Sequence, residues 1–344
     1  MNETGGIMKF LRVALVAGLV VCGLASEKRA SQDRIESNVP LQQAGQGGEG
    51  QDSTSPKEGR IEAQPQDFTA RCHAVGVVVC QGFDSPLINI AARWPAAGLY
   101  PGGDNMIHGK FDREEKASGE GSLRFEILGH TGQNAAGFWR QPFGRNFGPG
   151  ATFYVQFRER FSAEMLKNDW GDTTWKQVIL HNEGATCGEV ELTTAQYYHA
   201  GFPIMYTECG GRGLATNNGS PPTKLEQGDY NCWYGKTNAK DCFLYPANQW
   251  VTFYYEISIG PWGKPESSIN AWAALDGKPL RQWIKMQNFV LKNDHPGHDY
   301  DCLTLLTYMT NKDAGRNLPT AYAWYDELIV STKPIAPPAP AAAP

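Results

Sequence analysis

Strict alternation between apolar and polar side chains constrains the fold of this chain more than any other sequence feature. In the segment FYVQFRERF at 153–161, Phe153, Val155, Phe157 and Phe161 fall on one side and Tyr154, Gln156, Arg158 and Arg160 on the other. A period of two places successive side chains on opposite faces of a β-strand. The same pattern runs through 122–128, 175–181, 189–197, 251–259, 269–275, 303–309 and 322–330. The sequence predicts an all-β protein.

Turn residues and composition refine this prediction. Clusters of Gly, Pro and Asn separate the alternating segments, and the chain of 344 residues contains 38 Gly, 15 Phe, 14 Tyr and 10 Trp. Many short strands with such punctuation are typical of a two-sheet antiparallel sandwich or jelly roll. The one helical turn that the sequence predicts lies at 162–168, beginning at a Ser cap. A net charge of −5 argues against a strongly basic nucleic-acid binder.

The first 25 residues have the features of a secretory signal peptide. Residues 8–25 read MKFLRVALVAGLVVCGLA, with Lys9 and Arg12 before a short apolar run and small residues at the end. Cleavage after Ala25 would release a secreted or periplasmic protein. Two alternatives are a lipid anchor at Cys22, although Val21 stands where a small residue is preferred, and a retained anchor helix, although the run is short for a membrane span.

The rest of the chain divides into three parts. Residues 26–69 are polar and almost free of aromatics, which predicts a disordered spacer. Residues 70–333 form one aromatic-rich block, the predicted jelly-roll domain, and residues 334–344 are a Pro/Ala-rich, extended tail. Export permits disulfides. Neighbouring cysteines suggest the pairs Cys72–Cys80, Cys187–Cys209 and Cys232–Cys242, with Cys302 free and buried, although sequence cannot fix the connectivity.

The order of five segments resembles the concanavalin A-like (LamG-like) jelly-roll superfamily, and within it the polysaccharide-lyase-like members. The segments are GEGSLRFEI, GATFYVQFRERF, WKQVILHNE, NQWVTFYYEISIG and YAWYDELIVST, and the resemblance spans about 80–333. It implies a fold of two antiparallel sheets. That superfamily contains lectins, hydrolases, lyases and adhesive modules, so the resemblance by itself does not fix an activity.

Odd-even counting along the strands assigns aromatic, arginine and amide side chains to one open face. Aromatic rings stack on sugars, and Arg binds carboxylates at two points, so we expect a groove for an acidic polysaccharide. The alternative is that the arginines pair with Glu126, Glu159 and Glu256 on the sheet surface. The expected substrate-binding residues are Arg124, Tyr154, Gln156, Arg160, Trp175, Tyr254, Glu256, Asn270 and Trp272.

If the protein is an enzyme, this face suits a lyase that cleaves by β-elimination. That reaction needs a group that neutralises the uronate carboxylate, a base for the C5 proton and an acid for the leaving oxygen. The candidates are Arg158, Gln156 or Gln177 for the carboxylate, His181 for the base, and Tyr197, Tyr198 or Tyr206 for the acid. Gln177 and His181 are four residues apart, whereas jelly-roll alginate lyases place Gln and His two apart. The alternative for His181 is a hydrogen-bonded histidine at a strand end.

Other functions fit the sequence less well or remain open. A retaining glycosidase needs two close carboxylates, and Glu189 and Glu191 lack the middle Asp of the usual motif. The main alternative to a lyase is a non-catalytic carbohydrate-binding or adhesive module on a flexible stalk. The resemblance also implies a structural Ca²⁺ held by Asp84 and Asp326, where the first and last strands pair. The alternative there is a capped turn at Asp84 and a buried, hydrogen-bonded Asp326.

Overall fold

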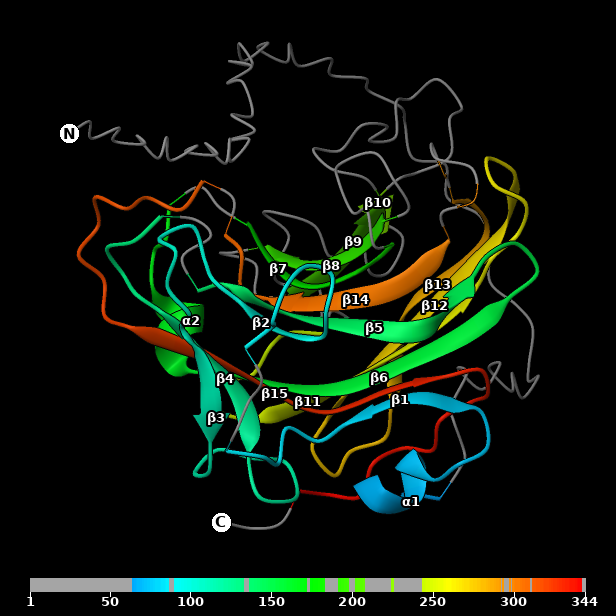
Figure 1. The fold of residues 1–344 in the computed structure, drawn as a ribbon, viewed down its shortest axis with the longest axis horizontal. Coiled ribbons are helices and arrows are strands. Elements are labelled where there is room, and N and C mark those ends of the chain that lie inside the picture. The colour runs from blue at the N-terminus through cyan, green and yellow to red at the C-terminus, as the bar shows by residue number, and fades with distance from the viewer. Residues whose placement is uncertain are drawn as a thin grey trace, which may run out of the picture. The chain divides into compact units, whose positions relative to one another are not determined.

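The computed structural model describes most of the predicted jelly-roll region. The described residues are 64–86, 90–132, 136–171, 174–182, 191–197, 202–207, 224–225, 243–291, 293, 297, 299–309 and 311–341. Two antiparallel sheets lie face to face (Figure 1). The all-β, two-sheet architecture predicted from the alternation is confirmed.

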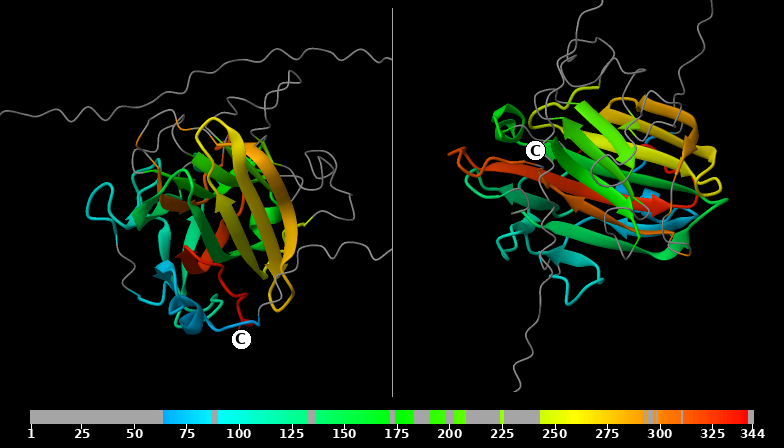
Figure 2. Two further views of the ribbon diagram at one scale, coloured as in Figure 1. Left: turned by 90° about the vertical axis from the view of Figure 1, so that its right-hand side faces the viewer. Right: turned by 90° about the horizontal axis from the view of Figure 1, so that it is seen from above.

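One sheet has eight strands in the order β13-β12-β11-β6-β15-β4-β3, with β1 also paired to β15. Its strands are β1 (Val77–Gln81), β3 (Gly109–Asp112), β4 (Ser122–Ile127), β6 (Thr152–Phe161), β11 (Trp250–Ser258), β12 (Pro265–Leu275), β13 (Arg281–Val290) and β15 (Ala321–Ser331). Figure 2 shows β11, β12 and β13 running side by side at one edge, coloured yellow to orange. We call this layer the eight-stranded sheet.

The second layer, the seven-stranded sheet, has the order β10-β9-β8-β7-β14-β5-β2. Its strands are β2 (Gly98–Tyr100), β5 (Phe138–Phe147), β7 (Thr174–His181), β8 (Glu191–Tyr197), β9 (Phe202–Thr207), β10 (Lys224–Leu225) and β14 (Tyr300–Leu306). The helices are α1 (Phe68–Cys72) and α2 (Ala163–Lys167). The predicted cap of α2 is confirmed, since the Ser162 side chain accepts a hydrogen bond from the Met165 amide.

The core lies between the two sheets, where the inward side chains of both layers meet. Phe153, Val155 and Phe157 of β6 are fully buried, as the alternation predicts. Phe157 stacks on Phe253 of β11 with ring centroids 5.4 Å apart. Each buried aromatic of this kind stabilises the fold by about 1.5–3 kcal/mol through the hydrophobic effect. The face of β6 that points away from this core carries Gln156 and Arg158.

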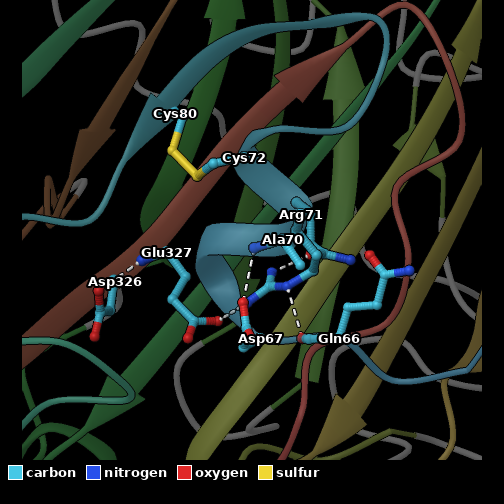
Figure 3. Close-up of a disulfide and its surroundings, with 9 residues drawn as sticks. Gln66, Asp67, Ala70, Arg71, Cys72, Cys80, Asp326 and Glu327 are labelled. Carbon is cyan, nitrogen blue, oxygen red and sulfur yellow. Dashed lines mark hydrogen bonds and ion pairs between the residues drawn. A yellow bond between two sulfur atoms is a disulfide. The ribbon is translucent and has the colours of Figure 1, made fainter.

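Both ends of the described chain pack on this outer face of the eight-stranded sheet. Gln66 forms a parallel bridge with Pro338, and Ile335 is buried in a cluster with Tyr254 and Trp272. The predicted disulfide Cys72–Cys80 is confirmed and ties α1 to β1 (Figure 3). The tail predicted as an extended appendage is, up to residue 341, part of the folded surface.

The other cysteine predictions have different outcomes. Cys302 is free and buried in β14, as expected. The pairs Cys187–Cys209 and Cys232–Cys242 lie outside the described residues, as do the signal segment and Cys22. In the part of the chain that the structure describes, no helix has the length and apolar character that a membrane span requires.

Candidate functional site

The structure does not bring the predicted site residues to one face. Gln156 and Arg158 lie on the outer face of the eight-stranded sheet, covered by the two chain ends. Gln156 accepts a hydrogen bond from Arg71 Nη1 at 2.5 Å and donates one to the Ala336 carbonyl at 3.1 Å. Arg158 forms an ion pair with Asp276 and lies 3.6 Å from the Glu327 carboxylate. Arg158 is therefore neutralised by the protein's own acids.

The two ends of the described chain also cover two aromatic candidates. Tyr254 and Trp272 pack together with ring centroids 5.4 Å apart, and the Tyr254 hydroxyl accepts a hydrogen bond from the Ile335 amide at 3.2 Å. Both side chains are buried. Odd-even counting predicts on which face a strand residue lies, but not that a distant part of the chain covers that face.

The uncovered part of this outer face carries arginines that are paired with acids. Arg124 binds Asp112 at 2.7 Å, and Arg160 binds Glu115 at 2.9 Å. Arg124 and Arg160 thus form ion pairs at the sheet surface, as the alternative prediction stated. Their partners are not the predicted Glu126, Glu159 and Glu256. Half-buried Asn270 donates a hydrogen bond to Glu256 at 3.0 Å. Tyr154 lies beside Glu256, whose charge adds to burial in raising the pKa of the phenol.

Trp175 and Gln177 of β7 point into the space between the sheets. Trp175 stacks on Phe161 at 5.5 Å, and Gln177 Nε2 donates a hydrogen bond to Glu159 at 2.6 Å. The cause is an irregular register between Lys176 and Val178, which shifts the alternation by one residue. The expectation that Gln177 and His181 share a face is therefore wrong, because it assumes a regular strand.

His181 lies on the outer face of the seven-stranded sheet, together with residues from neighbouring strands. Its register partner on β14 is Cys302. The adjacent row of that face joins Arg140 of β5 to Thr304 of β14 and Ile179 of β7, and continues through Thr193 of β8 to Tyr206 of β9. Residues paired across neighbouring strands lie on the same face of a sheet, so Arg140, Thr304 and Tyr206 share this face.

The hydrogen bonds of His181 determine which ring nitrogen carries the proton. Nδ1 lies 2.7 Å from the Asn182 carbonyl oxygen, which can only accept, so Nδ1 is the donor. Nε2 lies 2.7 Å from Thr304 Oγ1 and accepts the hydroxyl proton. Burial, together with the smaller effect of the positive charge of Arg140, lowers the pKa of His181 to about 4. The ring is neutral at neutral pH.

Arg140 supplies the positive charge of this face. Its guanidinium group lies 5.0 Å from the centre of the Trp94 ring and donates a hydrogen bond to the Pro95 carbonyl. The side chain is buried. The sequence reasoning missed β5 because Pro142 and Gly144 interrupt it, and both residues disfavour a regular strand. The available signal was Arg140 within FWRQPF, a segment in which three of the six residues are aromatic.

Three tyrosines were predicted as the acid of this site, and Tyr197 is the last residue of β8. Tyr206 is half-buried on β9, and Lys224 of β10 is its register partner. Tyr198 lies outside the described residues. The strand pairing places Tyr206 on the same face as His181.

The two acids expected to hold calcium bind the same loop. Asp84 accepts a hydrogen bond from the Glu120 amide at 2.6 Å, and Asp326 accepts from the amides of Ala117 and Ser118 at 2.8 and 3.2 Å. Calcium takes six to eight oxygen ligands, and the described residues contain no cluster of three His, Cys, Asp or Glu side chains that could hold a metal. The arrangement fits a loop anchored by carboxylates, and a calcium ion here stays a prediction.

Comparison with known proteins identifies the fold. No family model matches the chain, and no curated protein does. Among solved structures, the PL-14 alginate lyase from Aplysia kurodai matches with a TM-score of 0.52 and 11% identity, over 75% of this chain and 99% of that one. The chain has a concanavalin A-like jelly-roll fold. The endo-β-1,4-glucuronan lyase from the fungus Trichoderma reesei matches this jelly roll with a TM-score of 0.44 and 14% identity, over 70% and 92% of the two chains.

Proposed function

We propose that this protein binds an acidic polysaccharide along the outer face of the seven-stranded sheet and cleaves it by β-elimination. The observation that carries the proposal is that a neutral histidine, a buried arginine and a tyrosine from three different strands lie on one face. The fold supports it, since a solved structure that shares the fold over almost its whole length is an alginate lyase.

We assign a task to each of the three groups. Removing the C5 proton of a uronate builds up negative charge next to its carboxylate. The positive charge of the buried Arg140 stabilises this negative charge. His181 has an unprotonated Nε2 and is the proton acceptor. Tyr206 is the acid for the leaving oxygen. β7 and β9 are separated by one strand, so their backbones lie about 10 Å apart.

Export is part of the proposal. The segment 8–25 has the composition of a signal peptide, and the disulfide Cys72–Cys80 is of the kind that persists in oxidising compartments. We infer that the mature protein acts outside the cytoplasm, where acidic polysaccharides occur as extracellular polymers.

A specific observation favours a non-catalytic binding module as the second candidate. On the outer face of the eight-stranded sheet, Arg124 stacks on the half-buried ring of Tyr322 at 5.1 Å, close to Lys110. Aromatic and cationic groups at a partly exposed surface suit the binding of an acidic sugar without cleavage.

His181→Ala separates the two candidates. We expect it to abolish formation of the conjugated double bond that elimination creates, measured by ultraviolet absorbance on alginate, glucuronan and heparin-like polymers, and to leave polymer binding intact. The matched control is His108→Ala, since His108 pairs with Asp104 at 2.7 Å outside this face. Binding by the wild type with no absorbance change on any polymer would favour the binding module.

A further inference from the structure

We propose that the Thr304 hydroxyl takes the proton from the substrate, and that His181 Nε2 accepts the proton that the hydroxyl gives up. This inference rests on the proposed function, because it refines how the base of that site works. The evidence is a hydrogen-bonded chain from the Asn182 carbonyl through the His181 ring to the Thr304 hydroxyl.

Both nitrogens of the His181 ring are already engaged. Nδ1 donates to the Asn182 carbonyl, and the lone pair of Nε2 points at Thr304 Oγ1, each across 2.7 Å. Of the two residues, His181 is the less exposed, at 3% against 7% for Thr304. A proton from a bound sugar therefore reaches Nε2 by way of Oγ1.

The neighbouring groups do not compete with this path. The Cys302 sulfur contacts the ring as a weak hydrogen-bonding group, 3.3 Å from Nδ1 and 3.6 Å from Nε2. Burial raises the pKa of the Cys302 thiol, with the charge of Asp301 acting in the same direction, so it stays protonated and is no base. Arg140 adds a positive field that favours negative charge on Oγ1 while the proton moves.

The arrangement follows the logic of nucleophilic triads. In such sites a hydroxyl is hydrogen-bonded to an unprotonated imidazole nitrogen, and a third group holds the opposite nitrogen in the donor state. Here the third group is the carbonyl of Asn182. Since Thr304 and His181 stand on neighbouring strands of one sheet, the separation of the two groups is fixed by backbone pairing.

The proposed step is balanced in protons and electrons. The C5–H bond of the uronate breaks and its proton passes to Thr304 Oγ1, while the original Oγ1 proton passes to His181 Nε2. The electron pair of the C5–H bond forms the C4=C5 double bond, and the C4–O bond breaks. The leaving oxygen takes its proton from the Tyr206 hydroxyl, and exchange with water returns His181 and Tyr206 to their starting states.

The test compares Thr304→Val with Thr304→Ser in the full mature chain. Val matches the shape of Thr without the hydroxyl, and Ser keeps the hydroxyl. We expect Val to lower the rate of elimination by about 100-fold or more and Ser to retain it within about tenfold, in line with the usual contribution of a positioned proton-transfer group, with polymer binding unchanged in both.

A second readout does not depend on activity. Nuclear magnetic resonance of the His181 ring reports its protonation, and loss of the donor to Nε2 destabilises the neutral ring. Thr304→Val should raise the pKa of His181, whereas Thr304→Ser should leave it near the wild-type value. Two results would each overturn the role of Thr304. One is full activity of Thr304→Val, and the other is an unchanged pKa of His181 in that variant.

The outcomes separate this inference from the function on which it rests. If the wild type forms no double bond on any polyuronate, both the lyase function and the role of Thr304 are contradicted. If the wild type is active and Thr304→Val is equally active, the lyase function stands and His181 takes the proton directly.

Discussion

At the scale of single residues, the buried His181 makes the stability of the protein depend on pH. Burial, with the positive charge of Arg140 acting in the same direction, lowers its pKa to about 4 from an ordinary 6.5. Between these values the unfolded chain binds the proton and the folded chain does not, so the free energy of unfolding falls as the pH drops from 6.5 to 4, by up to about 3 kcal/mol.

His181→Gln removes this titration. We expect urea unfolding of the wild type to lose stability between pH 6.5 and 4, and the slope of stability against pH in that window to be shallower in the variant. Equal slopes would mean that His181 is accessible to protons in the folded state, which would contradict its burial.

Glu159 makes the free energy of unfolding depend on pH in the opposite sense to His181. It is buried between the sheets beside Gln177 and Tyr325, and burial raises its pKa to about 8 from 4.5. The folded protein holds this proton where the unfolded chain has lost it, so the stability is complete below pH 4.5 and falls as the pH rises to 8. Over the whole window the loss is on the order of 5 kcal/mol.

Glu159→Gln mimics the protonated carboxyl and should raise the free energy of unfolding above pH 8 with little effect near pH 4.5. Chemical denaturation at both pH values measures this. The control is Glu126→Gln, because Glu126 forms a surface ion pair with Lys110 at 2.9 Å. A variant that is less stable than the wild type at high pH would show that Glu159 is charged in the fold.

At the scale of elements, the two ends of the described chain, residues 66–72 and 335–341, bind each other and the eight-stranded sheet. We call this arrangement the clamp. Arg71 of α1 forms a buried ion pair with Glu327 of β15 and also binds the Gln66 carbonyl at 3.2 Å (Figure 3). The Gln66 amide donates a hydrogen bond to the Pro337 carbonyl, and the Gln66 carbonyl accepts one from the Ala339 amide. Arg71 therefore connects the start of the domain, its last strand and the tail.

Arg71→Met tests this clamp. Removing one partner of a buried pair leaves the other charge without compensation and typically costs about 3–5 kcal/mol, so the variant should lose a large part of its stability in thermal or urea unfolding. The control is Arg316→Met, since Arg316 pairs with Asp169 and Asp313 at an exposed site, where such pairs contribute about 0–1 kcal/mol. Similar losses in the two variants would contradict the clamp.

The elements also show where sequence reasoning succeeds and where it stops. The strongly alternating strands β4, β6 and β11 were predicted within two residues of their bounds. β5 was missed because Pro142 and Gly144 lie within it. In β7 the strand was predicted, but its register shift was not, and one inserted residue moved Gln177 to the opposite face from that expected. Alternation describes a strand and carries no information about an irregularity within it.

At the scale of the whole molecule, the fold could be predicted and the composition of the site only in part. His181 and Tyr206 were named from the sequence and share a face in the structure. Arg158 was expected to complete that face, but it belongs to the other sheet, and Arg140 supplies the charge instead. Which sheet a strand joins depends on long-range pairing, and which face stays open depends on where the chain ends pack. Neither follows from local pattern.

The central claim is that the outer face of the seven-stranded sheet breaks a polyuronate chain by elimination. Mass spectrometry of the products formed from alginate or glucuronan measures this most directly, because elimination leaves an unsaturated end that is lighter by one water molecule than the end left by hydrolysis. We predict unsaturated oligosaccharides from the wild type and none from His181→Ala. Saturated products, or intact polymer after incubation with every polyuronate, would contradict the claim.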